Sequence, residues 1–230
     1  QRHLGVFNFL PMTRTNLPVT NNTATDAPTS ARSTNSNRRE LRRLLRARRR
    51  SLSPAVQARA SAGLLRQLQK QPWFNRAQRI ALYWPSDGEI DPRPVAATAW
   101  RLNKRCYLPV LHPWLKRHLW FTPFARNTRF APNRFGIPEP VGPARAPLNN
   151  RHLDVVLLPL VGFDRAGGRL GMGGGFYDTT FAAKRRGKGF KRPRLVGVAH
   201  SCQEVDALAL ASWDVPLDGI ATEREYIAIR

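Results

Sequence analysis

The sequence has few cysteines, few acidic residues and no long hydrophobic segment. Its two cysteines, Cys106 and Cys202, form neither a CxxC pair nor a zinc-ligand spacing, and a chain of 230 residues does not need a disulfide to fold. No apolar run approaches the roughly 20 residues of a membrane-spanning helix. These absences argue against a disulfide scaffold and a membrane protein, and we expect a cytoplasmic protein.

Acidic residues are heavily outnumbered. The chain has 15 Asp and Glu against 38 Lys and Arg, which gives a formal net charge of +23 at pH 7. Such a charge attracts polyanions over about a Debye length, near 10 Å at moderate salt. Nucleic acid, phosphorylated nucleotides and small polycarboxylates are all candidate partners, and the net charge does not rank them.

The composition divides the chain into a tail and one domain. Residues 1–37 are rich in Thr, Asn, Pro and Ser and show no sustained apolar period, so we expect a disordered N-terminal tail. Its segment Leu4–Leu10 is too short and too interrupted for a secretory core. Residues 38–230 are long enough for a single domain with a hydrophobic core.

Apolar spacing in residues 38–230 predicts an alternation of helices and strands, which is typical of an α/β fold with a mostly parallel, open sheet and helices on both faces. Ligands usually bind such sheets at the carboxyl ends of the strands. We expect Asn127–Pro147 to be a proline-rich loop. The predicted helices cover residues 38–50, 54–70, 93–103 and 176–184, and the predicted strands cover 79–84, 105–111, 119–124, 153–160, 195–199 and 219–222.

A glycine-rich segment, RLGMGGGFYD at residues 169–178, follows a predicted buried strand and precedes a predicted helix. The four glycines between Gly171 and Gly175 let the backbone approach a ligand, and their amides can form an anion nest. Arg169 can pair with phosphate oxygens through its planar guanidinium. The segment matches neither a Walker loop nor a dinucleotide fingerprint. We interpret it as a different phosphate-binding loop, the alternative being a flexible turn that merely lets strand and helix pack.

An acidic residue, Asp178, lies in the first turn of the helix predicted after these glycines. Mg²⁺ prefers one or two carboxylates together with phosphate oxygens, so Asp178 is a candidate metal ligand. Its alternative role is a charge partner of the helix N-terminus, which contributes about 0.3–1 kcal/mol. The residues alone do not decide between these two roles.

The glycine-rich segment and the preceding LDVVLLPLVGFD (153–164) together resemble the signature of the 5-formyltetrahydrofolate cyclo-ligase family, also called 5,10-methenyltetrahydrofolate synthetases. The resemblance is specific because further segments agree in order and spacing, and it extends from about residue 38 to the C-terminus. It implies a Rossmann-like fold in a single domain. The agreeing segments are SDGEID (86–91), YLPVLHP (107–113), FGIPEP (135–140) and WDVPLD (213–218).

The resemblance implies a reaction in which ATP drives the closure of 5-formyltetrahydrofolate to 5,10-methenyltetrahydrofolate, with release of ADP and phosphate. Phosphorylation turns the formyl oxygen into a good leaving group, and N10 then attacks the formyl carbon. ATP is thereby implied as co-substrate and Mg²⁺ as cofactor. We expect a monomer that acts on these small molecules.

The resemblance also implies roles for individual residues. The family's K-x-x-x-R pair, which binds ATP phosphates, aligns with Arg38 and Arg42, so arginine replaces lysine at the first position. With so many arginines nearby, Arg39, Arg43 or Arg46 are alternatives to this pair. The full predicted ATP set is Arg38, Arg42, Arg169, Leu170, Gly171, Met172, Gly173, Gly174, Gly175, Phe176 and Tyr177.

For the folate, the resemblance implies contacts from Glu89, Gly173, Gly174 and Tyr177. A carboxylate at Glu89 can accept two hydrogen bonds from the aminopyrimidinone edge of a pterin. A solvated turn position for Glu89 and a core position for Tyr177 are the alternatives. Asp178 and Asp214 are implied as Mg²⁺ ligands, with Asp218 as a rival for the second place, and we expect Arg169 and Tyr177 to act in catalysis.

Two other functions compete with this one. The basic helix at 38–50, which holds eight arginines, and KRRGKGFKRPR at 184–194 favour a nucleic-acid binder. No aromatic and basic residues interleave as in an RNA-recognition motif, and a simple binder would not need a nucleotide loop. The third hypothesis is a different enzyme on the same scaffold, one that uses ATP or a sugar phosphate, because proteins with the same fold can catalyse different reactions.

Overall fold

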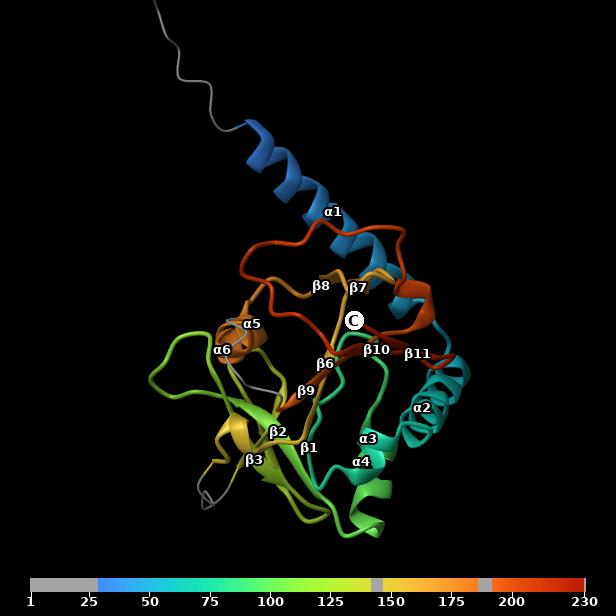
Figure 1. The fold of residues 1–230 in the computed structure, drawn as a ribbon, viewed down its shortest axis with the longest axis vertical. Coiled ribbons are helices and arrows are strands. Elements are labelled where there is room, and N and C mark those ends of the chain that lie inside the picture. The colour runs from blue at the N-terminus through green and yellow to red at the C-terminus, as the bar shows by residue number, and fades with distance from the viewer. Residues whose placement is uncertain (1–28, 142–146, 186–191, 230) are drawn as a thin grey trace, which may run out of the picture.

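The computed structural model describes residues 29–141, 147–185 and 192–229. Its centre is a seven-stranded sheet in the order β11-β10-β9-β6-β1-β2-β3 (Figure 1), in which the five inner strands run parallel and the two edge strands run antiparallel to their neighbours. This confirms the predicted α/β fold. The strands are β1 (Arg79–Ala81), β2 (Arg105–Leu111), β3 (Leu119–Phe124), β6 (Val155–Pro159), β9 (Arg194–Val198), β10 (Gly219–Ala221) and β11 (Tyr226–Ala228).

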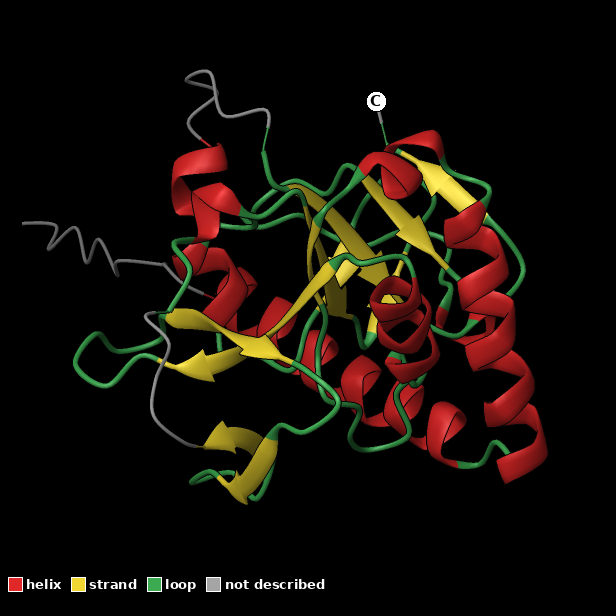
Figure 2. Ribbon diagram, turned by 90° about the horizontal axis from the view of Figure 1, so that it is seen from below, coloured by secondary structure: helices red, strands yellow, loops and turns green. Residues whose placement is uncertain are grey.

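Each face of the sheet has its own hydrophobic core. Successive strand residues point to opposite faces of the sheet. Ile80 therefore belongs to the hydrophobic core cluster of the first face, and Ala81 belongs to the second core cluster, on the other face. Helices α2 (Pro54–Gln69), α3 (Pro72–Arg76) and α4 (Arg93–Arg101) cover the first face. The second is covered by the short helices α5 (Phe176–Thr180) and α6 (Ala182–Arg185) and by the segment before β10. Figures 1 and 2 show helices on both sides of the strands.

The N-terminal helix α1 (Thr29–Arg50) lies across one end of the sheet, where it contacts the 3-10 helix η2 (Ser201–Gln203) (Figure 1). It begins at Thr29 and not at Arg38, so the last part of the predicted disordered tail is helical. Residues 1–28 of that predicted tail lie outside the described residues. The fully buried Leu45 anchors α1 in a small third cluster with Val161 and Leu170.

Two local predictions were wrong. The expected loop at Asn127–Pro147 contains a hairpin of β4 (Arg129–Pro132) and β5 (Pro138–Val141), which tolerates its prolines because it is an isolated two-stranded ribbon with free edges. The Asn133 side chain accepts hydrogen bonds from two backbone amides in its turn. The expected helix at 176–184 is interrupted at Phe181, which separates α5 from α6.

Two further observations bear on the other functions considered. Most of the basic run at 184–194 lies outside the described residues, which end at 185 and resume at 192. No helix within the described ranges is long and apolar enough to cross a membrane.

The loops that follow the parallel strands meet at one edge of the sheet. β1 leads into the turn at residues 85–91, and β2 into the loop at 112–118. β6 leads into a small antiparallel pair, β7 (Gly162–Phe163) and β8 (Arg169–Leu170), and from there into the glycines. β1 lies between β2 and β6, a position at which α/β sheets bind ligands.

Candidate active site

The glycine loop, residues 171–175, is an open turn between β8 and α5. Gly173 and Gly175 have φ angles of 94° and 67°, left-handed values that residues with a side chain rarely adopt. A methyl group built on Gly171 or Gly175 would meet no atom within 4 Å. The loop thus combines a backbone that requires glycine with free space around it, which suits close approach of a ligand.

The remaining members of the loop segment differ in exposure. The Leu170 side chain is fully buried in the α1 cluster, so only its backbone is available to a ligand. Met172 is 54% exposed. Gly174 lies against the Phe176 ring, which a methyl group on Gly174 would approach to 2.8 Å. Within the loop part of the predicted ATP set, Leu170 therefore offers no side chain to a ligand, whereas Met172 and the glycine backbone are accessible.

Arg42 is brought directly to the glycine loop. Its Nε donates a hydrogen bond of 2.8 Å to the Gly171 carbonyl, and its guanidinium lies 3.8 Å from where a methyl group on Gly173 would stand. Burial lowers the pKa of Arg42. Arg38, one turn earlier on α1, donates to the Ala209 carbonyl at 2.9 Å and lies 3.9 Å from Asp214. These contacts place Arg42 at the glycine loop and Arg38 beside the segment at residues 209–214.

The rival arginines of α1 face elsewhere. Arg39 is exposed, and Arg43 is exposed and paired with Glu40 one turn away. Arg46 donates to Asp87 at 2.7 Å. Of the predicted pair and these alternatives, Arg42 is the arginine that contacts the glycines, and phosphate binding by Arg38 and Arg42 stays a prediction.

Arg169 points into the protein. Its buried guanidinium forms an ion pair with Asp178 and donates to the Val215 carbonyl. Asp178 also accepts a hydrogen bond of 3.1 Å from the Val215 amide. Two donors of Arg169 are therefore directed at Asp178 and the backbone rather than at the space beside the glycines. Its immediate role is to fasten the start and end of the glycine loop to the 213–218 segment.

The two predicted metal ligands lie close to each other because Val215, which bonds to Asp178, follows Asp214 in the chain. Asp214 accepts a hydrogen bond of 2.9 Å from the Ala211 amide, and its side chain is 11% exposed. Within the described ranges no cluster of three or more His, Cys, Asp or Glu could hold a metal ion. Two carboxylates fit Mg²⁺ only when phosphate oxygens or water complete the coordination.

Asp218, the rival for the second metal position, is held elsewhere. It accepts hydrogen bonds from the Leu195 amide at 2.7 Å and pairs with Lys184 at 2.8 Å. It directly precedes β10 and therefore lies at the amino end of that strand, away from the carboxyl edge where the loops meet. The geometry favours Asp214 over Asp218.

The turn at 85–91, which contains SDGEID, is held by a buried arginine. The Arg49 guanidinium is fully buried and donates to the Asp87 carbonyl at 2.8 Å, to the Asp87 carboxylate at 2.8 Å and to the Leu160 carbonyl at 3.2 Å. Arg46 and Arg50 also pair with Asp87, at 2.7 and 3.4 Å. Asp87 and Gly88 have positive φ angles, 51° and 76°, so this anchoring stabilises an unusual backbone.

Glu89 is buried beside this anchor rather than solvated on the turn. Its side chain is 8% exposed, accepts a hydrogen bond of 3.1 Å from the Ser86 amide and lies 3.6 Å from Arg49. Burial raises the pKa of Glu89 to about 7, although the Arg49 charge opposes this. A carboxylate in this position changes its charge near neutral pH.

Tyr177 lies on the same side of the site. It packs against the second core cluster, and burial, together with the charge of Glu89, raises the pKa of its hydroxyl. The core position considered for Tyr177 is therefore partly met, and a position near the folate stays a prediction. Glu89 and Tyr177 approach each other from the 85–91 turn and from the end of the glycine loop.

Two residues that support the site, Arg49 and Gln57, escape sequence reasoning, and His200, shortly after the end of β9, joins them in that support. Arg49 is one arginine in a run of similar ones, Gln57 donates to the carbonyls of Arg49 and Gly88, and His200 bonds to the Gly88 carbonyl at 3.1 Å. Burial lowers the pKa of His200. The only available signal for Arg49 was its spacing of three residues from Arg46, which places both on one face of α1.

The comparisons with known proteins agree with one another. A model of the 5-formyltetrahydrofolate cyclo-ligase family matches residues 34–223. The 5-formyltetrahydrofolate cyclo-ligase of Escherichia coli K12 is 38% identical over 179 residues, which cover 78% of this chain and 96% of the relative. The Haemophilus influenzae enzyme of the same name is 44% identical over 142 residues, covering 62% and 74%.

Solved structures show the same fold. The NMR structure of Aquifex aeolicus 5,10-methenyltetrahydrofolate synthetase superposes with a TM-score of 0.71 at 29% identity, over 84% of this chain and 93% of that one. A synthetase from Mycoplasma pneumoniae, at 22% identity and a TM-score of 0.62, supports the fold alone. With the family match over most of its length, this chain belongs to the 5-formyltetrahydrofolate cyclo-ligase family.

Proposed function

We propose that this chain converts 5-formyltetrahydrofolate to 5,10-methenyltetrahydrofolate with consumption of ATP. The observation that carries the proposal is the meeting of two sites at one edge of the sheet. Arg42 faces the glycine loop, as a phosphate site requires, and Glu89 and Tyr177 lie at the other end of that loop. A nucleotide and a folate can therefore be held side by side.

The reaction follows from this juxtaposition. The formyl oxygen attacks the γ-phosphorus of ATP, and ADP departs. N10 of the folate attacks the formyl carbon and loses its proton, after which the oxygen leaves with the phosphate. The chain's contribution is mainly to hold the two substrates in line and to neutralise negative charge.

Specific residues support each task. Arg42 and Arg38 carry positive charge at the phosphate side, and the glycine amides can donate there. Glu89, when ionised, accepts hydrogen bonds from the pterin. Asp178 and Asp214 would hold Mg²⁺, which neutralises phosphate charge when bound. Arg169 supports catalysis through Asp178, which it orients. We further propose that the enzyme is cytoplasmic and monomeric. Analytical ultracentrifugation would test the monomeric state.

The direct test is to mix the protein with 5-formyltetrahydrofolate and Mg-ATP and to follow the near-ultraviolet absorbance of the methenyl product. We expect a signal that requires ATP and is accompanied by stoichiometric ADP. Absence of an ATP-dependent signal would contradict the proposed reaction. A signal with a different nucleotide product would contradict the phosphorylation step.

The metal assignment is tested by Asp178→Asn and Asp214→Asn. Both are expected to raise the Mg²⁺ concentration needed for half-maximal turnover, because each removes a carboxylate ligand. Asp214→Asn is the cleaner change, since Asp178 also pairs with Arg169. Asp206→Asn, at an exposed position, is the control. An unchanged Mg²⁺ dependence in Asp178→Asn removes that residue from the metal site.

A further inference from the structure

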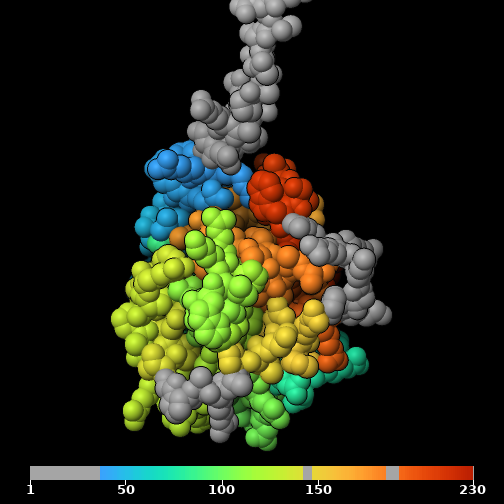
Figure 3. Space-filling view, turned by 90° about the vertical axis from the view of Figure 1, so that its left-hand side faces the viewer, coloured from blue at the N-terminus to red at the C-terminus, as the bar shows by residue number. Residues whose placement is uncertain are grey.

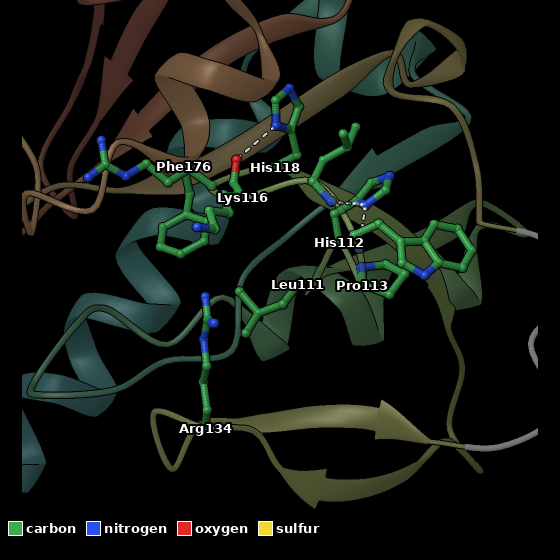
Figure 4. A pocket seen from close by; sticks show the side chains of 10 residues that line it. Leu111, His112, Pro113, Lys116, His118, Arg134 and Phe176 are labelled. Atoms are coloured by element: carbon green, nitrogen blue, oxygen red, sulfur yellow. Dashed lines mark hydrogen bonds between the residues drawn. The ribbon is translucent and has the colours of Figure 1, made fainter.

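A cavity opens where the glycine loop ends. It has a volume of about 230 Å³ and lies between the 112–118 loop, the turn of the β4–β5 hairpin and Phe176, the first residue of α5 (Figure 4). In the space-filling view the green surface around residues 112–118 adjoins the orange surface around residues 170–180 (Figure 3). The cavity therefore borders the glycine loop through Phe176, which follows Gly175.

Its lining carries positive charge that the protein does not neutralise. Lys116, Arg117 and Arg134 line the cavity and are exposed. Among the described residues, no acidic group lies within ion-pair distance of any of the three. The nearby Glu139 is used by its own neighbours, because it accepts hydrogen bonds from the Leu111 amide and from Asn133. Three cations around one cavity favour an anionic occupant.

The cavity also presents apolar surface. Trp114 is 80% exposed and Leu115 is 52% exposed, and Phe176 forms part of the wall (Figure 4). His112 does not compete for a ligand through its Nδ1, which accepts hydrogen bonds from the amides of Trp114 and Leu115 and so shapes the loop. The preferred occupant is thus a molecule with an aromatic or apolar part next to carboxylates.

We infer that this cavity is a carboxylate subsite that holds the aminobenzoyl-glutamate end of the folate, with Lys116, Arg117 and Arg134 facing its carboxylates. The inference rests on the proposed function. A reduced folate carries its pterin at one end and a benzoyl ring with a glutamate at the other. Glu89 and Tyr177 suit the pterin, and the triphosphate of ATP is served by Arg42 and the glycines, so the cations beyond Phe176 are available to the glutamate.

The test compares two substrates in two proteins. One substrate is 5-formyltetrahydrofolate, and the other is the primary amide of 5-formyltetrahydropteroate, a pteroate analogue that lacks the glutamate and carries no carboxylate. The variant is Lys116→Gln/Arg117→Gln/Arg134→Gln. The control is Arg126→Gln/Arg129→Gln, which removes exposed cations from the adjoining loop and hairpin outside this cavity. Steady-state KM values are measured for both folates and for ATP, at low and at high salt.

We expect the triple variant to raise KM for the glutamylated substrate by about tenfold, because exposed ion pairs contribute up to about 1 kcal/mol each and tenfold corresponds to about 1.4 kcal/mol. KM for the pteroate analogue and for ATP should not change, and the control should match the wild type. High salt should raise KM for the folate in the wild type and not in the variant.

Three results would overturn the subsite. Equal rises for both folates would indicate general damage to the loop, a rise confined to ATP would indicate a nucleotide subsite, and no change would leave the cations without a ligand. A wild type inactive on both folates contradicts the proposed function instead. In that case the subsite is tested separately, by NMR saturation transfer from the protein to p-aminobenzoylglutamate. The proposal requires that this fragment bind the wild type and not the triple variant.

Discussion

The middle and the C-terminal end of α1 use the same residue type in opposite ways. Near its C-terminal end, Arg46, Arg49 and Arg50 all pair with one carboxylate, Asp87. In the middle of the helix, Arg38 and Arg42 donate to backbone carbonyls. Among the described residues, the only carboxylate within ion-pair distance of either is Asp214, 3.9 Å from Arg38. A paired guanidinium fixes structure, whereas one bonded only to carbonyls keeps its charge for a ligand.

The largest expected effect comes from removing Arg49. Arg49→Met should lower the free energy of unfolding by about 3–5 kcal/mol, because it leaves Asp87 and Glu89 with less compensation for their burial. Urea unfolding monitored by circular dichroism measures this. Arg48→Met, on the exposed side of the same helix turn, should change stability by less than about 0.5 kcal/mol. Similar losses in the two variants would contradict the structural role assigned to the arginines that pair with Asp87.

Glu89, which lies beside the buried Arg49, makes the stability of this part of the molecule depend on pH. Its folded-state pKa of about 7 lies above the ordinary value of 4.5. Between these two pH values the Glu89 carboxyl is therefore protonated in the folded protein and ionised in the unfolded chain. The stability contribution of Glu89 is therefore fully present below pH 4.5 and is lost as pH rises through about 7. Relative to Glu89→Gln, the wild type should lose on the order of 3 kcal/mol of unfolding free energy between pH 4 and pH 8.

Urea titrations of both proteins across this pH range provide the measurement, and parallel curves would contradict it. The groups that face Glu89 and set this behaviour are Arg46 and Arg49 of α1, Asp87 and Ser86 of the turn, Tyr83 after β1 and Tyr177 of α5. In turnover, KM for the folate should fall as pH rises through about 7 in the wild type, because the ionised form accepts the pterin hydrogen bonds. Glu89→Gln should lack this dependence.

In the middle of α1, Arg42→Ala should affect ligand binding more than stability. We expect KM for ATP to rise by about 10- to 100-fold, since hydrogen bonds to charged groups contribute about 1.5–3 kcal/mol. The free energy of unfolding should fall by no more than about 1 kcal/mol, for the loss of the Gly171 bond. Arg43→Ala is the matched control on the exposed face. A stability loss as large as that of Arg49→Met would contradict the division of roles.

The smallest effect is expected at the glycines that Arg42 faces. Gly173→Ala forces a side chain onto a backbone with φ of 94° and should cost about 1–2 kcal/mol of stability. Gly171→Ala, which has neither a positive φ nor a neighbour within 4 Å, should leave stability nearly unchanged. Thermal unfolding of the two variants makes the comparison, and equal melting temperatures would show that the Gly173 conformation is not required.

Sequence reasoning succeeded where local pattern carries the information. The apolar run before the glycines predicted the central β6, and the glycines themselves marked the loop. It missed the inward direction of Arg169, because a buried ion pair with Asp178 depends on the path of the intervening turn. It could not distinguish Arg49 from Arg48, since only the position of Asp87 in space makes one of them a buried anchor.

The hairpin at 129–141 was missed for a different reason. Its prolines argue against a strand, and only the side-chain bonds of Asn133 and the free edges of the ribbon reconcile them with pairing. The start of α1 was misplaced because residues before Arg38 carry no apolar period, whereas the helix continues to Thr29. Both errors concern elements whose stability does not come from burying a regular apolar face.

The small cluster of Leu45, Val161 and Leu170 has a consequence for motion. It is the hydrophobic attachment of α1 near the glycine loop, and it is far smaller than the two clusters that bind the sheet to the other helices. Elements with few apolar contacts open at lower free energy than the global unfolding. Arg42 belongs to α1 and Gly171 to the glycine loop, so a phosphate bound by both would link the helix to the loop. Its binding should slow amide hydrogen exchange in the helix and the loop together.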